Sequence, residues 1–215
     1  MLSHRNMKKP FLLFDFDGVI ADSFHLAYEV NAKKCPHLTE EEYRKRFEGN
    51  INDAEEPVHT ADCRPDLDFF EEYVPRMQQE VKIFAGMSEA ITELEKTYTL
   101  VAISSTITSP IREFLQSHGL ASHFAQIMGN DVHKSKVEKM KMVFAQYDVT
   151  ADDCVFITDT LGDMREADHM GVGSIGVSWG FQSSETLEKG NSFRIVDTPE
   201  ELVRAIGEYF SSRAM

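Results

Sequence analysis

The sequence predicts an α/β fold, with a parallel sheet core and a small helical cap inserted after the first strand. Short apolar runs rich in Val, Ile and Phe recur along the 215 residues, and helical patterns separate most of them. The first run leads into two aspartates and a glycine. The segment that follows, residues 23–81, breaks the alternation and holds four of the seven prolines.

The individual elements are predicted from these patterns in chain order. Residues 88–98 and 136–147 carry apolar side chains at helical spacing. Ser109 as N-cap, Pro110 in the first turn and Gly119 at the end predict another helix. Because strands alternate with helices, the strands should be parallel and covered on both faces. The predicted buried strands are residues 11–14, 99–103, 124–128, 154–158, 172–179 and 193–196.

The break in the alternation divides the chain into two expected domains. The core comprises residues 1–22 and 82–215, and the cap comprises residues 23–81, which contain no convincing buried strand. The cap begins just after the first strand, so it is well positioned to act as a lid over that strand's carboxyl end. The N-terminus lacks the apolar centre of a secretory signal, and either Met1 or Met7 can be the native start.

The amino-acid composition and the net charge restrict the classes of binding partner. The net charge of −14 disfavours nucleic acid and anionic membrane, because either would need a basic patch. No apolar run is long enough to predict a transmembrane helix. The three cysteines, Cys35, Cys63 and Cys154, are far apart in sequence and form no CxxC motif, which favours reduced thiols in the cytoplasm. A monomer or a homodimer is expected.

Two acids mark the end of the first strand. Asp15 and Asp17 follow the buried run of residues 11–14 and precede Gly18. Alternation along a strand places residues i and i+2 on one face, so both carboxylates point to the same region. Open α/β sheets bind ligands at this carboxyl edge. Because close carboxylates repel each other, a cation or a shared proton is expected between them.

Three later segments bring polar groups to the same edge. Ser104 follows a predicted strand, and its hydroxyl and nearby N–H groups can hold phosphate. The loop at residues 131–136 offers lysines, and Asp159 and Asp163 follow another strand. Each segment alone is an ordinary turn or loop. Together, in this order, they predict a phosphate site, and their all-oxygen ligands suit Mg²⁺.

These motifs resemble those of the haloacid dehalogenase superfamily, in its phosphatase branch. The DxDG motif corresponds to residues 15–18 and the acidic DxxxD motif to residues 159–163. Ser104 matches the strand-end hydroxyl motif. Lys136 matches the lysine motif best, with Lys134 as an alternative.

Other stretches carry the resemblance further. Residues 175–181 and 197–202 are similar to phosphoglycolate phosphatase-like members, and residues 84–87 resemble the re-entry from the family's cap. Two positions depart from the common pattern: Val137 stands where many relatives have Pro, and Thr158 where many have Gly. Neither change removes a required functional group.

The resemblance implies a Rossmann-like core and a Mg²⁺-dependent phosphatase that hydrolyses a small phosphorylated metabolite through an aspartyl-phosphate. The implied site residues are Asp15 (nucleophile and metal ligand), Asp17 (acid/base, and metal ligand through its backbone carbonyl), Asp159 (metal ligand), Asp163 (metal-bound water or lysine orientation), and Ser104, the Ser105 backbone and Lys136 (phosphate).

Alternatives remain open. A same-fold phosphomutase would use the same motifs, and a phosphonate hydrolase would need a Schiff-base lysine such as Lys33 or Lys34 of the cap. A non-catalytic binding or regulatory protein is disfavoured by the four intact motifs. Specificity should lie in the cap, where residues 47–50 resemble the family's specificity loop. Arg44 and Arg46 precede it and either bind a substrate anion or lie solvated on a helix face.

Overall fold

The structure, a computed structural model, describes residues 9–52 and 60–213. The choice between Met1 and Met7 lies outside these residues. The described strands are β1 Phe11–Phe14, β2 Ala21–Asp22, β3 Lys82–Ile83, β4 Thr99–Ile103, β5 Phe124–Met128, β6 Cys154–Thr158, β7 Gly173–Val177 and β8 Arg194–Val196. The described α-helices are α1 Phe24–Lys34, α2 Glu40–Lys45, α3 Phe69–Glu80, α4 Met87–Glu95, α5 Thr108–Ser117, α6 Lys136–Tyr147, α7 Leu161–His169, α8 Ser184–Leu187 and α9 Pro199–Arg213.

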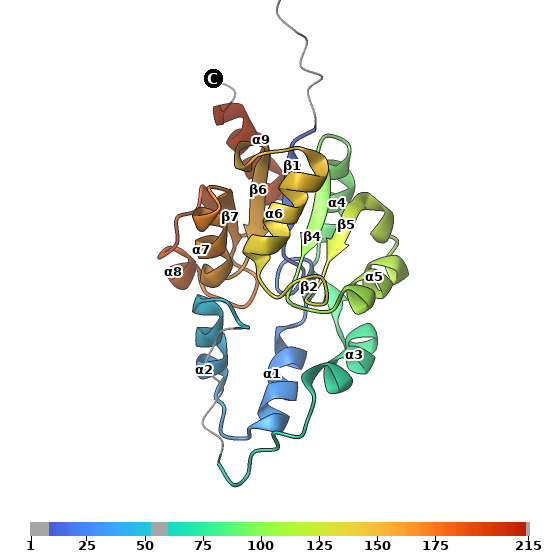
Figure 1. The fold of residues 1–215 in the computed structure, drawn as a ribbon, viewed down its shortest axis with the longest axis vertical. Coiled ribbons are helices and arrows are strands. Elements are labelled where there is room, and N and C mark those ends of the chain that lie inside the picture. The colour runs from blue at the N-terminus through green and yellow to red at the C-terminus, as the bar shows by residue number, and fades with distance from the viewer. Residues whose placement is uncertain (1–8, 53–59, 214–215) are drawn as a thin grey trace, which may run out of the picture.

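Six of the strands form one parallel sheet in the order β5-β4-β1-β6-β7-β8 (Figure 1). At least one helix lies between each of these strands and the next along the chain, as the crossover connections of parallel pairing require. The chain crosses from one half of the sheet to the other around β1, which lies between β4 and β6. The α/β fold expected from the sequence is therefore confirmed.

The central strand β1 is buried on both faces. Leu12 and Phe14 belong to a core cluster that includes side chains of α4, α5 and α9. Phe11 and Leu13 belong to a second cluster on the other face, with side chains of α6 and α7. Alternation along the strand explains this division, and double burial explains why β1 is a continuous apolar run.

Several elements are shorter than the sequence predicts. The strand expected at residues 172–179 ends at Val177, because the chain turns at Ser178 and brings the indole N–H of Trp179 to the carbonyl of Val19, 3.2 Å away. The strand expected at 193–196 begins one residue later, at Arg194. The helix expected at 88–98 ends at Glu95, because the chain must turn before β4 begins.

The predicted start of α5 is wrong. Ser109 is not the N-cap: Ile107 is, and the helix begins at Thr108. The side chain of Asp131, from a loop that follows β5, accepts from the backbone N–H and the hydroxyl of Thr108, both at 2.7 Å. The cap is thus supplied by tertiary contact instead of by the neighbouring residue. At the other end, Gly119 with φ of 72° terminates the helix as expected.

The segment between β2 and β3 is helical and projects from the carboxyl edge of the sheet (Figure 1). We call its described parts, residues 24–52 and 60–80, the helical insert. The short strands β2 and β3 flank the insert and pair with each other in antiparallel fashion. Within it, Thr39 and Glu42 form a capping box at α2, and Asp68 caps α3.

The helical insert contacts the core at the start of α7. A Cβ atom built on Gly162 would lie 2.2 Å from the carbonyl oxygen of Gly49, so only glycine permits this approach. The carboxylate of Glu166 accepts from the side-chain amide of Asn50 at 3.1 Å. The side-chain amide of Asn52 donates to the carbonyl of Lys134 at 3.0 Å. The insert therefore closes one side of the sheet edge.

Two cysteines that are far apart in the sequence lie close together in the fold. The Sγ atoms of Cys35 and Cys63, 28 residues apart, lie 2.6 Å from each other in the helical insert. Cys154 is buried at the start of β6.

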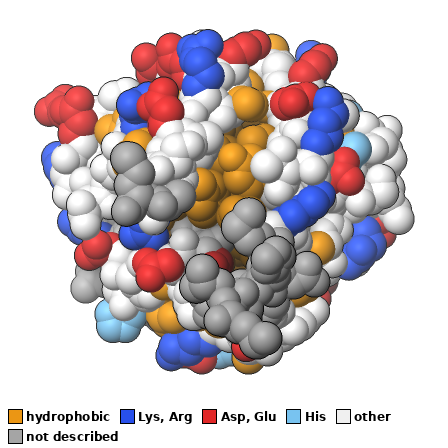
Figure 2. Space-filling view, turned by 90° about the horizontal axis from the view of Figure 1, so that it is seen from above, with side chains coloured by type: hydrophobic (Ala, Val, Ile, Leu, Met, Phe, Trp, Pro, Cys, Tyr) orange, Lys and Arg blue, Asp and Glu red, His pale blue; other side chains and the backbone are white. Residues whose placement is uncertain are grey.

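No helix in the described part of the chain is long and apolar enough to cross a membrane. On the face seen from above, acidic and basic side chains are interspersed around a hydrophobic strip and form no single-sign patch (Figure 2).

Candidate active site

The sheet brings the acidic motifs together at one edge. Residues 15–17 follow β1, residues 104–106 follow β4, and residues 159–163 follow β6. These three strands are neighbours in the sheet and run in the same direction, so their carboxyl ends meet. This edge is where the sequence predicts the site.

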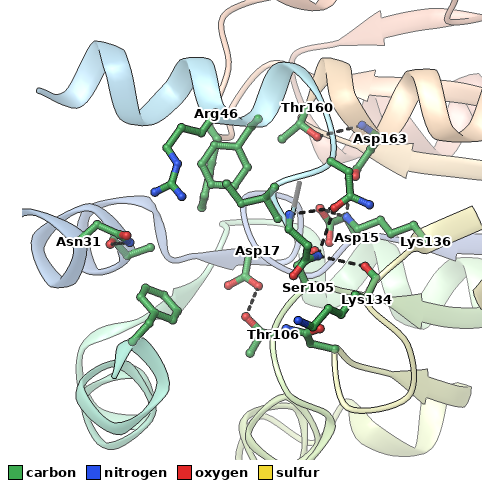
Figure 3. Close-up of a pocket in the computed structure, with 18 of the residues that line it drawn as sticks. Asp15, Asp17, Asn31, Arg46, Ser105, Thr106, Lys134, Lys136, Thr160 and Asp163 are labelled. Atoms are coloured by element: carbon green, nitrogen blue, oxygen red, sulfur yellow. Dashed lines mark hydrogen bonds and ion pairs between the residues drawn. The ribbon is translucent and has the colours of Figure 1, made fainter. Parts of the chain in front are cut away.

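Lys136 lies between two buried carboxylates. Its Nζ atom is 2.8 Å from Oδ2 of Asp15 and 2.5 Å from Oδ2 of Asp163. The other oxygen of Asp15 accepts the backbone N–H of Phe16 at 2.7 Å, which fixes the carboxylate's orientation. Asp163 also accepts from the hydroxyl of Thr158 at 2.8 Å. Lys136, at the first position of α6, therefore contacts both acidic motifs (Figure 3).

Burial and charge set the protonation of this cluster. Burial raises the pKa of Asp15 well above its usual value, although the charge of Lys136 opposes the shift. Burial by itself would lower the pKa of Lys136, but Asp15 and Asp163 together raise it. The pKa of Asp163 is lowered, because Lys136 and its hydrogen bonds outweigh the effect of burial. Lys136 is therefore a permanent cation beside Asp15.

Asp17 accepts hydrogen bonds from side-chain hydroxyls on several elements. Ser23 and Tyr73 donate to its Oδ1 at 2.8 and 2.9 Å. Thr106 donates to its Oδ2 at 2.8 Å, and Ser104 approaches the same oxygen at 3.3 Å. Tyr73 belongs to α3 of the helical insert and is buried. The carboxylate is therefore positioned jointly by the core and the insert.

The three residues after β4 differ in their contacts. Ser104 is fully buried, with its hydroxyl directed to Asp17 and to the N–H of Thr106, which it accepts at 2.9 Å. Ser105 and Thr106 form part of the cavity wall. Behind them, the buried ammonium of Lys139 donates to the carbonyl of Ser104 at 2.6 Å. Burial, with a contribution from nearby Lys136, lowers the pKa of Lys139 to about 8.

Asp159 lies behind the cavity and is completely buried. Its Oδ2 accepts the backbone N–H of Phe181 at 2.6 Å, while its Oδ1 has no hydrogen-bond partner among the described residues. Burial raises its pKa to about 7, although the Phe181 bond opposes the shift. Gly18, with φ of 76°, packs so closely that a Cβ atom there would lie 1.9 Å from Oδ2.

These features fit a divalent cation. A buried carboxylate oxygen without a partner is costly unless a cation or a proton accompanies it. The available donors are all oxygens, which suit Mg²⁺. In residues 9–52 and 60–213, no three His, Cys, Asp or Glu side chains already form a metal-ligand cluster. Mg²⁺ does not need one, because it is usually held by one or two carboxylates and several waters.

A cavity of about 370 Å³ opens between the sheet edge and the helical insert (Figure 3). Of the predicted site residues, Asp15, Asp17, Ser105, Lys136 and Asp163 line it. The other two predicted residues, Ser104 and Asp159, are not part of the wall; Ser104 contacts Asp17, and Asp159 accepts the N–H of Phe181.

The structure shows which of the candidate cationic side chains of the insert line the cavity and which do not. Arg46 lines the cavity and points toward its centre (Figure 3). Arg44 instead pairs with Glu40, stacks over Phe24 and donates to the carbonyl of Phe181, a contact that joins insert and core. The two lysines also differ: Lys34 lines the cavity, whereas Lys33 is half-exposed and pairs with a glutamate of α3.

Sequence reasoning missed several residues of the site. Thr106 stands two residues after Ser104, and this same-face spacing is a signal that was available. Lys139 lies one helical turn after Lys136, which is a weaker signal. Tyr73 is 56 residues from Asp17 in a segment without matching motifs, so its role was not readable from the sequence.

Comparisons with known proteins agree with this architecture. The family model "Haloacid dehalogenase-like hydrolase" matches residues 12–177. A phosphoglycolate phosphatase from Vibrio parahaemolyticus is 22% identical over 91% of this chain and 95% of its own length. The probable phosphatase IndB from Dickeya dadantii is 27% identical over 92% of this chain and 93% of its own length. A haloacid dehalogenase-like family hydrolase from Streptococcus pneumoniae has a similar structure, with a TM-score of 0.75 at 18% identity, over 92% of this chain and 98% of that one.

The family match covers most of the chain, including the acidic motifs after β1 and β6. The protein belongs to the haloacid dehalogenase-like hydrolase family. The resemblance stated from the motifs is thereby confirmed, and the chain is an enzyme of the hydrolase class.

Proposed function

We propose that the protein is a Mg²⁺-dependent phosphatase that hydrolyses a small phosphorylated metabolite. The observation that carries this proposal is the buried cluster at the sheet edge, where Lys136 contacts Asp15 and Asp163 beside Asp17. A carboxylate nucleophile with a fixed cation next to it suits the transfer of a dianionic phosphoryl group. The names of the relatives from Vibrio and Dickeya support the same activity.

In this proposal Asp15 attacks phosphorus and forms an aspartyl-phosphate. Its Oδ1 is held by the N–H of Phe16, so the carboxylate is already oriented. Asp17 donates a proton to the leaving oxygen and later accepts one from the attacking water. The hydroxyls around Asp17 keep its carboxyl group in place for both transfers.

The phosphoryl oxygens are held by groups that line the cavity. Lys136 supplies a compact positive charge, and the backbone at Ser105 supplies N–H donors. Ser104 was predicted as a phosphate contact, but its hydroxyl here approaches Asp17, so positioning that acid is the role its contacts support. We retain its phosphate contact as a prediction.

Asp15, the backbone carbonyl of Asp17 and Asp159 would hold Mg²⁺, with Asp163 retaining a metal-bound water or orienting Lys136. The Oδ1 of Asp159, which has no hydrogen-bond partner in the part of the chain that the structure describes, supports this assignment. When bound, the ion would neutralise charge on the carboxylates and on the transferring phosphoryl group.

We also propose that the chain divides into a core, residues 1–22 and 82–215, and a cap, residues 23–81. The contacts of Gly49 and Asn50 with α7 support a cap that closes over the site. Such a lid excludes water and large substrates, and therefore favours a small molecule.

The test is a phosphatase screen over small phosphorylated metabolites, phosphoglycolate included, with Mg²⁺ and with a chelator. We expect phosphate release that requires Mg²⁺ and is absent in Asp15→Asn. A phosphomutase would instead return an isomeric phosphate ester without free phosphate. A folded protein that releases phosphate from no member of the panel, at any Mg²⁺ concentration, contradicts the proposal.

A further inference from the structure

The cavity is larger than a phosphoryl group requires. Its volume of about 370 Å³ lies within the range of about 300–1,000 Å³ typical of sites for small organic ligands. The groups that handle phosphate occupy the sheet edge, and the helical insert supplies much of the remaining wall. The insert side therefore accommodates the leaving group, and its lining describes what that group should be.

One wall of the insert side is aromatic. Phe69, Phe70 and Tyr73, in the first half of α3, all line the cavity. The Phe69 ring stacks on Tyr73, with centroids 5.0 Å apart, and meets Phe70 edge-on at 5.2 Å. Phe69 and Phe70 are only half-buried, so a ligand ring placed against them would remove apolar surface from water.

A second wall is polar and cationic. Asn31 and Lys34 lie on the same face of α1 as Ala27, and all three line the cavity. Arg46 reaches in from the turn after α2 (Figure 3). Among the described residues that the insert contributes to the lining, the charged ones are Lys34 and Arg46, and both are cations. This side is therefore suited to an anionic or hydrogen-bond-accepting substituent.

We propose that the substrate is a phosphomonoester whose leaving group carries a planar ring with an anionic or accepting substituent. The ring lies against Phe69 and Phe70, and the substituent lies toward Arg46 and Lys34. This inference rests on the proposed phosphatase function. A small leaving group with a carboxylate but no ring would meet the two cations and leave the aromatic wall uncovered.

Four alkyl phosphates test the ring and the charge separately: ethyl phosphate, benzyl phosphate, 4-carboxybenzyl phosphate and phosphoglycolate. All four release an alkoxide-type leaving group, so differences in leaving-group chemistry stay small. We expect kcat/KM to rise about tenfold or more from ethyl to benzyl phosphate, because a ring is buried. The carboxylate should add about tenfold again, through charge-assisted hydrogen bonds.

Substitutions assign each effect to its wall. Phe70→Ala should lower the benzyl-to-ethyl ratio of kcat/KM several-fold. The matched control is Phe193→Ala, an exposed ring on the core near α9, which should leave the ratio unchanged. Arg46→Ala should lower the 4-carboxybenzyl-to-benzyl ratio. Arg44→Ala should not, because Arg44 does not line the cavity and its guanidinium pairs with Glu40.

The outcomes separate this inference from the proposed function. If neither the four esters nor any member of the metabolite panel releases phosphate, the phosphatase proposal fails and the inference fails with it. If members of the panel react but none of the four esters does, the ring subsite alone is overturned. If ethyl and benzyl phosphate react equally well, and Phe70→Ala changes neither, the phosphatase proposal stands and the ring subsite is overturned. A preference for phosphoglycolate over 4-carboxybenzyl phosphate overturns it as well.

Discussion

The sheet edge and the helical insert line one cavity, but their residues are held in different ways. At the sheet edge the functional groups fix one another: Lys136 lies between Asp15 and Asp163, and hydroxyls surround Asp17. On the insert side, half-buried aromatic rings and long cationic side chains come from three separate elements. Rigid, mutually paired groups suit a fixed reaction, and an adaptable wall suits the selection of a ligand.

Tyr73 is the exception that joins the two regions. It belongs to the insert, yet its hydroxyl donates to Asp17 at 2.9 Å. The comparison therefore predicts three grades of effect. Changes at the sheet edge should abolish the turnover of every ester. Changes in the insert should alter the ratio of kcat/KM between different esters. A change at Tyr73 should lower turnover modestly and also alter that ratio.

The largest effect is expected at Asp15. Asp15→Asn preserves shape but removes the attacking charge, and Lys136 keeps Asp163 as a partner. Turnover should fall by roughly 10⁴-fold or more, as it does when other covalent nucleophiles are removed. Phosphate release and circular dichroism should be measured together, because the fold is expected to persist. Substantial activity in this variant, with contaminating phosphatase excluded, would overturn the mechanism.

A smaller effect, graded by the leaving group, is expected at Asp17. Asp17→Asn keeps the backbone carbonyl but cannot transfer a proton, and such help is worth roughly 10²–10⁴-fold. An alkyl phosphate should lose this full factor. p-Nitrophenyl phosphate should lose less, because its leaving group needs little protonation. Equal losses on the two esters would argue against Asp17 as the acid.

The sheet edge was also the region that the sequence predicted best. Asp15 and Asp159 follow buried strands that are rich in apolar residues, and a parallel sheet brings the carboxyl ends of such strands together whatever lies between them. Local pattern was enough here, because each acid is placed by its own strand. The shortened ends of β7 and α4 show where local pattern stops being informative.

The insert was predictable only as a helical segment. Arg44 and Arg46 are two residues apart, and only the packing of α2 decides that one joins the core and the other lines the cavity. The same applies to Asp131, which caps α5 from a distant loop, and to the contact between Cys35 and Cys63. These pairings depend on tertiary structure and leave no periodic signal in the sequence.

Tyr73→Phe tests the link between the two regions. It removes one hydroxyl from Asp17 while Ser23 and Thr106 still donate, so the loss should correspond to about 0.5–1.5 kcal/mol, or roughly 2- to 12-fold in kcat. The loss should be greater for an alkyl phosphate than for p-nitrophenyl phosphate. Tyr28→Phe is the matched control, because its hydroxyl donates to Leu38 within the insert. If both variants behave alike, Tyr73 is merely a packing residue.

The smallest expected effect is on stability, and it probes the buried acid behind the site. Burial raises the pKa of Asp159 to about 7, from about 3.8 in an unfolded chain. Between these values the native state binds more protons than the unfolded state, so this group's contribution to the free energy of unfolding decreases as pH rises and is lost above about pH 7. A cation that pairs with the ionised carboxylate offsets the free-energy cost of burying its charge. Mg²⁺ should therefore raise Tm by a few degrees at pH 8 and by less at pH 5.5.

Differential scanning fluorimetry at the two pH values, with and without Mg²⁺, measures this difference directly. Asp159→Asn supplies the control, because an amide neither titrates nor attracts the ion strongly. It should weaken both the fall in Tm toward high pH and the response to Mg²⁺, while Asp153→Asn, at an exposed acid before β6, should change neither. An equal Mg²⁺ response at both pH values in the parent protein would mean that Asp159 is not the carboxylate that the ion neutralises.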